Sequence, residues 1–529
     1  MSEFGVWIAI AFGSILSAAL FVLCTLPVIA ILQQGGYSGK AFVRWYCRKG
    51  NMLPRRHNLL TLSLFLLTAL FCLCFSFLGA RYAGLVSAAP FCGTLALYVY
   101  ASRHALKVPL KRTGRALRLL VAYFILTAGV CFGILVGLGY ASEAIGKELV
   151  SLFRFVPLTL VPLILPFIAA TANFIMKAYE VPRNRRYIAR AKRKLAESKC
   201  VKVGITGSFA KTSVKHMAAQ IAGTKFKVIA TPASYNTPMG IAKTVFETGL
   251  ACDVFFAEMG ARRMGDISEL CDMVSPDFGA VTGICPQHLE TFLSLENIKS
   301  EKGVLAQRTK KCVLGSSASE LPANDAFVYG KNFGAEEIIC SADGTRFQLV
   351  LGGERIPVET VLLGKHAAED IALAAALCHL LGMTKEEIAA GVKEVKPISH
   401  RLEKLNGNGG VVVLDDSYNS NVEGAKDAVE TLKLFTGKKF VVTPGLVELG
   451  VIEREENEKL GASLVGLDGV ILVGETQVLP VRNGYLAAGG EEAKLKIVKS
   501  PTAATEAIAA ELSAGDCVLF LNDLPDIYN

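Results

Sequence analysis

The chain has 529 residues, of which 52% are hydrophobic and only 19% are charged. That length allows three or four domains, and that composition excludes an ordinary soluble protein of this size. The formal net charge of +9 gathers in stretches beside apolar runs, so it gives no separate indication of nucleic-acid binding. Because the apolar runs crowd the beginning of the chain, we expect a membrane domain over residues 1–180.

Five apolar runs in this first part come close to the roughly 20 residues that a membrane helix requires. They cover about residues 5–32, 58–79, 83–101, 118–140 and 151–177. The short connection RYAG also allows a re-entrant turn between the second and third runs. The connections between these runs are alternately basic and poor in charge, and basic connections lie on the cytoplasmic side of a membrane. With an odd number of spans, this alternation predicts that the N-terminus lies outside the cell and that the chain after Met176 lies in the cytoplasm.

A basic stretch, VPRNRRYIARAKRKLAESK, follows the last apolar run. We expect a linker there, over residues 181–199. Its charge is typical of the cytoplasmic border of a membrane span, where it lies beside anionic lipid headgroups. A specific site for a lipid-phosphate substrate is the alternative.

From residue 200 onward, short β-rich runs alternate with helical patterns, which predicts mostly parallel α/β domains. A first series begins with VKVGIT and indicates a central domain over residues 200–398. A second series begins with VVVLDDS and indicates a C-terminal domain over residues 399–529, with PISHRLEKL as a hinge. The expected fold class is an α-helical membrane domain of about five spans, an α/β P-loop domain and a Rossmann-like α/β domain.

The stretch VGITGSFAKTSVK has the order of a phosphate-binding loop. Gly204 and Gly207, then Lys211 and Thr212, follow a predicted strand and open a predicted helix, which is the context that such a loop requires. Backbone N–H groups can surround the phosphates, the lysine can reach their outer oxygens, and the threonine can hold Mg²⁺. A glycine-containing turn with a surface lysine is the structural alternative.

Ala210 stands where a glycine normally precedes the lysine of such a loop. If this position requires a positive φ, alanine costs on the order of 1 kcal/mol, so we expect nucleotide binding to be weakened rather than abolished.

Glu258 ends the apolar strand DVFFAEMG, and its carboxylate is expected to point from the strand end toward the nucleotide as a further Mg²⁺ ligand. A strand-terminal acid in solvent is the alternative. His288 and Lys302 would by default be a structural histidine and a solvated helix lysine, because spacing alone does not single them out.

Seven stretches taken together resemble the Mur ligase family. In chain order over residues 200–529 they read GITGSFAKTS, SYNTPMGIAKTV, FFAEMGARRMGDISELCD, PQHLETFLSLENIKSEKG, ISHRLE, DDSYNSNVEGAKDAVETL and TPGLVELG. Within the family they look like the type that adds D-alanyl-D-alanine to UDP-MurNAc-tripeptide, the MurF type. The resemblance implies an ATP-dependent amide ligase that passes the γ-phosphate of ATP to a carboxylate and lets an amine displace it.

The resemblance also implies roles for single residues, with ATP and Mg²⁺ as cofactors. Lys211 and Thr212 would bind phosphate and Mg²⁺, Glu258 would bind the first Mg²⁺, and His288 would contribute to the second. Lys302 matches the lysine that is carbamylated in this family, which turns a cation into an anion that helps to ligate metal. Lys211, His288 and Lys302 are the expected catalytic residues.

Arg401 and Asp416 match residues that reach the nucleotide from the hinge and the C-terminal domain. The stretch GKHAAED departs from the G-x-H-N-x-x-N pattern of relatives. Ala367 and Asp370 replace the asparagines that the family associates with adenine binding.

Soluble family members begin with a small domain that grips the UDP of the substrate, and apolar runs occupy its place here. We therefore expect a multi-pass protein of the bacterial cell membrane with cytoplasmic catalytic domains. Its expected partners are a UDP- or lipid-linked muramyl peptide, an amino acid or dipeptide, and membrane lipid, with no nucleic acid. A ligase for another envelope polymer such as poly-γ-glutamate, a non-catalytic scaffold and an ATP-driven transporter are the alternatives.

Overall fold

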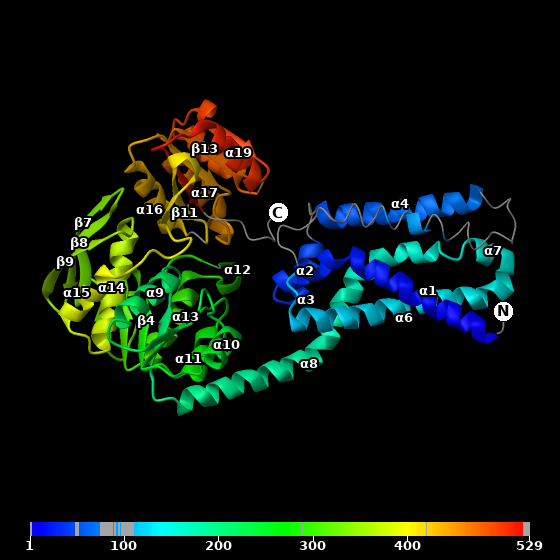
Figure 1. The fold of residues 1–529 in the computed structure, drawn as a ribbon, viewed down its shortest axis with the longest axis horizontal. Helices are drawn as coiled ribbons and strands as arrows, with labels where there is room; N and C mark the ends of the chain where they lie inside the picture. Colours follow the sequence, from blue (N-terminus) through cyan, green and yellow to red (C-terminus); the bar gives the residue numbers. More distant parts are fainter. Residues whose placement is uncertain are drawn as a thin grey trace. The chain divides into compact units, whose positions relative to one another are not determined.

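The computed structural model describes residues 3–47, 52–74, 88, 91–93, 96, 110–287, 289–418, 421–474 and 476–521 (Figure 1). The chain divides into two compact units, Met1–Asn184 and Arg185–Asn529.

The described part of the first unit is helical. Its helices are α1 (Glu3–Cys24), α2 (Leu26–Gln34), α3 (Gly39–Tyr46), α4 (Met52–Cys74), α6 (Gly114–Ile145), α7 (Lys147–Leu152), a 3₁₀ turn (Pro157–Leu160) and the first part of α8 (Val161–Glu197). Large apolar side chains are exposed on these helices, among them Phe12, Leu66, Ile125 and Phe174. An apolar exterior of this extent is what a helix facing lipid presents.

Three helices among the described residues are long and apolar enough to cross a membrane: Phe4–Cys24, Gly114–Ala144 and Pro157–Glu197. They correspond to the first, fourth and fifth expected runs. The second run forms a shorter apolar helix, Asn58–Cys74, and the expected span at 83–101 lies almost entirely outside the described residues. The expectation of five spans is therefore corrected to three candidates.

The stretch 181–199, expected as a linker, is mostly helical because α8 continues through it. In the second unit, Ala191 and Leu195 are buried in a core with helices of the central domain. The ring of Tyr187 packs on that of Phe246, with 4.6 Å between their centroids. The basic side chains of this stretch therefore project from an ordered helix with an apolar face.

The central domain is built on a parallel sheet with the strand order β2-β3-β1-β4-β5-β6. The strands are β1 (Val201–Thr206), β2 (Val228–Ala230), β3 (Val254–Glu258), β4 (Phe278–Val281), β5 (Lys311–Leu314) and β6 (Ala326–Val328). The middle strand β1 pairs with both β3 and β4. The carboxyl ends of these three strands therefore lie together, where open α/β sheets bind their ligands.

Helices cover both faces of this sheet (Figure 1). On one face lie α9 (Lys211–Ala222), α14 (Lys365–Leu380) and α15 (Lys385–Lys393), and on the other α10 (Pro238–Thr248), α11 (Asp266–Val274) and α13 (Leu295–Arg308). Alternate side chains of β3 enter the two cores, since Phe256 belongs to the first and Phe255 to the second. Burial on both faces explains why these strands read as continuous apolar runs.

A three-stranded antiparallel sheet, which the sequence analysis did not predict, packs against α14. It consists of β7 (Phe333–Ser341), β8 (Gly344–Leu351) and β9 (Glu354–Thr360). Gly352 and Gly353 join β8 to β9 with φ values of 58° and 84°. Two successive positive φ angles are typical of a tight hairpin, and glycine reaches them at the lowest cost.

The C-terminal domain has a second six-stranded sheet, in the order β10-β11-β15-β12-β13-β14. Its strands are β10 (Glu403–Asn406), β11 (Val412–Asp416), β12 (Lys439–Thr443), β13 (Gly469–Val473), β14 (Leu495–Val498) and β15 (Cys517–Leu521). Only β10 among them pairs in antiparallel fashion. The helices are α16 (Val422–Lys433), α17 (Glu453–Ser463), α18 (Val478–Ala487) and α19 (Pro501–Glu511). The predicted mostly parallel α/β architecture is confirmed for both sheets.

Candidate active site

The loop between β1 and α9 is shaped by its contacts with the end of β4. A β-carbon on Gly207, whose φ is 151°, would collide with the hydroxyl of Thr282, so the loop needs glycine here. The Ser208 N–H donates to the Gly283 carbonyl at 2.8 Å. The ring of Phe209 fills the space that a side chain on Gly283 would take. These contacts with the end of β4 fix the shape of the loop.

Ala210 has φ 62° and ψ −4°, which lies in the left-handed region, and it is the residue directly before the N-terminus of α9. Ala210 therefore takes the positive φ for which alanine is expected to carry an energetic cost. An L-residue with a β-carbon costs about 1 kcal/mol or more in this region, and glycine does not.

Ala210→Gly should therefore raise the free energy of unfolding by about 1 kcal/mol and lower the Kd for ATP. Thermal unfolding of the detergent-solubilised protein measures the first effect. Ala219→Gly, in the regular part of α9, is the matched control and should destabilise by about 0.5–1 kcal/mol. Destabilisation by both substitutions would contradict the strain assigned to Ala210.

The ammonium group of Lys211 lies against the loop, where it donates to the carbonyls of Gly207 at 2.7 Å and Ser208 at 3.2 Å. Burial lowers the pKa of Lys211, although the charge of Glu258 opposes the shift. The positive charge of Arg401 lowers this pKa further. A cation that is poorly solvated and close to another cation favours an anionic ligand such as a phosphate.

Glu258 ends β3 with its side chain only 1% exposed, which excludes the alternative of an acid in solvent. One carboxylate oxygen accepts from the Thr212 hydroxyl at 2.9 Å and from the Lys215 ammonium at 3.1 Å. The other accepts from the Asn236 amide at 3.2 Å. The carboxylate and the hydroxyl that were expected to hold Mg²⁺ are thus in direct contact.

These two oxygen donors fit Mg²⁺. Proteins commonly bind this ion at nucleotide sites through one or two carboxylates together with phosphate oxygens and water. Thr212 and Glu258 supply a hydroxyl and a carboxylate beside the loop.

Lys215 and Asn236 are functional candidates that the sequence analysis missed. Lys215 is fully buried, and burial lowers its pKa against the opposing charge of Glu258. A signal for it was present, because Lys215 follows Lys211 by four residues in a predicted helix and therefore lies on the same face. Asn236 comes from a separate loop, and no spacing in the sequence links it to the site.

Lys302 is not the solvated helix lysine of the default interpretation, since it is 3% exposed. Burial and the nearby charge of Lys211 lower its pKa to about 7, against the opposing charges of Glu301 and Asp266. The lowered pKa makes the neutral amine of Lys302 accessible near pH 7. A neutral amine is a nucleophile, and an ammonium group is not.

Helix α13, which carries Lys302, is fixed at two points along its length. The Ser294 hydroxyl caps the helix by accepting from the Asn297 N–H at 3.2 Å. The buried Glu301 carboxylate accepts from the N–H groups of Gly265 and Ile267, at 2.7 Å each, where α11 begins.

One expected site residue, Gly204, stands apart from this group. Gly204 lies within β1, where a β-carbon would press on Leu305 at 2.9 Å and Met259 at 3.0 Å, so close packing accounts for its need for glycine. His288 lies outside the described residues.

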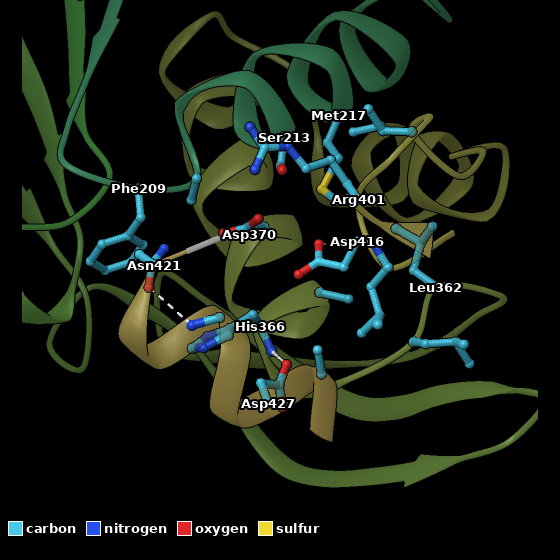
Figure 2. A pocket seen from close by; sticks show the side chains of 17 residues that line it. Phe209, Ser213, Met217, Leu362, His366, Asp370, Arg401, Asp416, Asn421 and Asp427 are labelled. Atoms are coloured by element: carbon cyan, nitrogen blue, oxygen red, sulfur yellow. Dashed lines mark hydrogen bonds between the residues drawn. The ribbon is translucent and has the colours of Figure 1, made fainter. Parts of the chain in front are cut away.

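A cavity of about 120 Å³ adjoins the loop (Figure 2). Its walls come from four segments far apart in the sequence: the loop with α9, the start of α14, the hinge, and the region from β11 to α16. Ala210, Asp370, Arg401 and Asp416 are among the residues that line it. The structure thus brings the two expected nucleotide-binding residues of the hinge and C-terminal domain, Arg401 and Asp416, to the phosphate-binding loop.

The hinge is held in an unusual backbone conformation around Arg401. His400 and Leu402 have φ values of 63° and 47°, and neither is glycine. The Leu402 N–H donates to Asp416 at 3.2 Å, and the Arg401 guanidinium lies 4.6 Å from the centre of the Tyr418 ring.

Two family models match this chain. The Mur ligase middle domain matches residues 205–378, and the Mur ligase glutamate ligase domain matches residues 400–522, which together make up more than half of the chain. The fold, the site and these matches define an ATP-dependent acid–amino acid ligase. Through its middle and C-terminal domains the chain belongs to the Mur ligase family.

The curated relatives include UDP-N-acetylmuramoyl-tripeptide–D-alanyl-D-alanine ligases. That of Mycobacterium bovis is 28% identical over 356 residues, which cover 60% of this chain and 69% of the relative. That of Bacillus subtilis is 26% identical over 336 residues, which cover 60% and 72%.

The fold is also found in solved structures. MurF from Acinetobacter baumannii has a TM-score of 0.58 at 20% identity and covers 65% of this chain and 78% of its own. MurF from Thermotoga maritima, solved in complex with ADP, has a TM-score of 0.58 at 24% identity and covers 65% and 81%.

Proposed function

We propose that this ligase joins D-alanyl-D-alanine, or a similar amine, to the terminal carboxylate of a muramyl peptide in cell-envelope synthesis. The observation that carries the proposal is the group formed by Lys211, the contact between Thr212 and Glu258, and the buried Lys302 around one phosphate-binding loop. Relatives whose names describe this reaction support the choice of substrates.

The reaction proceeds in two steps. A carboxylate oxygen of the peptide attacks the γ-phosphorus of ATP, the bond to the β-phosphate oxygen breaks, and ADP leaves an acyl phosphate. The amine then attacks the acyl carbon, a tetrahedral intermediate loses phosphate, and the amine loses a proton. Phosphoryl transfer of this kind depends on positioning and electrostatic stabilisation more than on a protein nucleophile.

The residues of the loop have distinct roles in this scheme. Mg²⁺, held by Thr212 and Glu258, would neutralise charge on the phosphates when bound. Lys211 orients the γ-phosphate and stabilises the negative charge that develops on it. Lys215 balances the buried charge of Glu258 and keeps the carboxylate directed at Thr212.

Lys302 would act as its carbamate. The neutral amine attacks CO₂, a nitrogen–carbon bond forms, and one proton is lost, which turns the side chain into an anion. The pKa of about 7 supports this modification because it supplies the neutral amine at physiological pH.

We further propose that the enzyme works at the inner face of the bacterial cell membrane, with its catalytic domains in the cytoplasm. Three candidate spans and the basic, ordered end of α8 support this location. A muramyl peptide presented at the membrane surface, UDP-linked or lipid-linked, is the expected acceptor, and membrane lipid is a further partner.

Release of ADP by the detergent-solubilised full chain tests the function. UDP-MurNAc-tripeptide and D-Ala-D-Ala are added singly and together, and the lipid-linked peptide is then supplied in place of the UDP-linked one. We expect ADP only when both substrates are present, with the lipid-linked acceptor turned over faster. Equal rates would refute membrane presentation, and no ADP with either acceptor would refute the ligase proposal and leave the scaffold as the better account.

A further inference from the structure

Helices α1 and α6 of the first unit run in opposite directions. Near the start of α1, the ring of Trp7 stacks on that of Phe132, which lies far along α6. Near the end of α1, the Thr25 hydroxyl lies 2.8 Å from the hydroxyl of Tyr123, which comes earlier in α6. The end of α1 and the start of α6 therefore lie at the same end of the helical unit.

This end of the unit is poor in negative charge. Residues 1–184 contain four acids, which are Glu3, Glu143, Glu148 and Glu180. The first three stand at the start of α1, in the last turn of α6 and in the first turn of α7, which is the opposite end. Glu180 alone reaches the start of α6, where it meets arginine side chains.

Glu180 is fully engaged by two of these arginines. It is 3% exposed, and one carboxylate oxygen accepts from Nε of Arg118 at 2.7 Å and lies 2.6 Å from Nη2 of the same side chain. The other oxygen accepts from Nη1 of Arg183 at 3.3 Å. One negative charge thus faces two positive charges, and the excess at this point is positive.

Arg115 adds a further cation that no carboxylate engages. It lies in the first turn of α6, and within the described part of the unit it forms no ion pair. Its guanidinium lies 3.8 Å from the centre of the Tyr37 ring. Two contacts hold this tyrosine, because the Asn173 amide donates to its carbonyl at 2.9 Å and the Gln33 amide to its hydroxyl at 3.2 Å. Contact with a ring face leaves most of the five N–H donors of a guanidinium unused.

An apolar surface continues from these cations along α6. Val121 and Ile125 lie on the same face of the helix as Arg118, three and seven residues further on. Their side chains are 58% and 61% exposed. A ligand with an anionic head and an apolar chain matches both parts of this surface, whereas a free phosphate matches only the first.

We propose that Arg115, with Arg118 and Arg183 beside it, binds the phosphate of an anionic phospholipid whose acyl chain lies along α6; this inference rests on the proposed membrane location. The planar fork of an arginine matches two phosphate oxygens at once. The tyrosine ring holds the fork of Arg115 in place before the lipid arrives, so less conformational entropy is lost on binding.

Lipid binding by the detergent-solubilised full chain tests this inference. Native mass spectrometry gives the Kd of phosphatidylglycerol and that of phosphatidylcholine with the same acyl chains. We expect the wild type to bind phosphatidylglycerol about tenfold more tightly or better, because the choline headgroup carries no net negative charge. Arg115→Gln should raise the Kd of phosphatidylglycerol about 10- to 100-fold, since it removes charge-assisted hydrogen bonds.

Two further variants separate a built site from a general attraction between charges. Arg44→Gln removes an exposed arginine from the last turn of α3, and it should change the Kd by no more than about twofold. Arg115→Lys keeps the charge but not the planar fork, so it should still weaken binding by about threefold or more. Equal effects of Arg115→Gln and Arg44→Gln, or a wild type that binds the two lipids equally, would overturn the site.

The source of the phosphate is tested by competition. Glycerol phosphate and inorganic phosphate should displace phosphatidylglycerol only weakly, because neither covers the apolar face of α6. Displacement at the lipid's own concentration would show a site for free phosphate and overturn the lipid assignment. ADP release and sedimentation with membranes, measured on the same protein, report separately on the ligase and on its location. Loss of the lipid preference with both of these retained would therefore overturn this inference alone.

Discussion

Lys211→Ala should reduce ATP-dependent ligation by two to three orders of magnitude, about 10²- to 10³-fold, while the protein remains folded. The side chain places a cation in direct contact with the phosphate-binding loop, since its ammonium donates to a loop carbonyl at 2.7 Å. Loss of one positioned charge in a buried phosphoryl-transfer site costs about 10²- to 10³-fold in turnover. The expected result is ADP release reduced by this factor or more in the presence of both substrates.

Unfolding of the variant is the competing explanation for such a loss. Removing Lys211 takes away a buried cation whose pKa burial already lowers, so the unfolding temperature should change little. Lys243→Ala is the matched control. This exposed lysine lies on α10, outside the phosphate-binding loop, and its ammonium is 3.6 Å from the carboxylate of Glu247. Retained turnover in Lys211→Ala would refute the phosphate-binding role, whatever the control shows.

Lys302→Ala should lose turnover to a similar extent, and the wild type should need CO₂. Because the pKa of Lys302 is lowered to about 7, the fraction of neutral amine rises as the pH rises through 7. The initial rate at which CO₂ activates the enzyme, measured at a fixed and limiting CO₂ concentration, should therefore increase from pH 6 to pH 8 by up to about tenfold. Removal of CO₂ should reduce the activity, and added bicarbonate should restore it.

Chemical rescue distinguishes the carbamate from a structural role of the lysine. A small carboxylic acid such as acetate can supply the missing anion to Lys302→Ala, and it should restore part of the turnover. Lys299→Ala, on the same helix α13, should keep its activity and its dependence on bicarbonate. A bicarbonate-independent wild type together with an unrescued variant would show that Lys302 serves as a plain amine.

The phosphate-binding loop could be predicted because its signal is local. Gly207, Lys211 and Thr212 stand within six residues, and the strand before them and the helix after them carry recognisable patterns. The order of the strands and helices could be predicted as well, because short β-rich runs alternate with helical patterns along the chain. The left-handed conformation at Ala210 could not be predicted from the sequence, which indicated only the cost of a positive φ there. The backbone angle depends on contacts such as those between the loop and the end of β4.

The rest of the site depends on contacts between distant segments. Burial of Lys302 depends on distant segments such as α11, which packs against α13. No pattern in ENIKSEKGVL distinguishes this stretch from an exposed helix. Asn236 reaches Glu258 from a loop without regular structure. The sheet of β7 to β9 was missed because its strands expose one face, so they lack the continuous apolar runs on which the analysis relied.

In the first unit, the apolar runs predict where helices lie but not where each helix ends. Hydropathy locates apolar runs well, but it does not show where a helix is interrupted. The first run is one such case, because α1 ends at Cys24 and Pro27 lies at the start of the separate helix α2.

The two left-handed residues of the hinge give the ligase a reserve of conformational energy. Each non-glycine residue in this region costs about 1–2 kcal/mol, so His400 and Leu402 together hold about 2–4 kcal/mol on either side of Arg401. This arrangement persists because other contacts outweigh the cost, among them that of the His400 ring with Asp415 at 2.7 Å and that of the Leu402 N–H with Asp416. A rotation of the C-terminal domain that broke these contacts would also relieve this strain, which would offset part of the free-energy cost of opening the cavity.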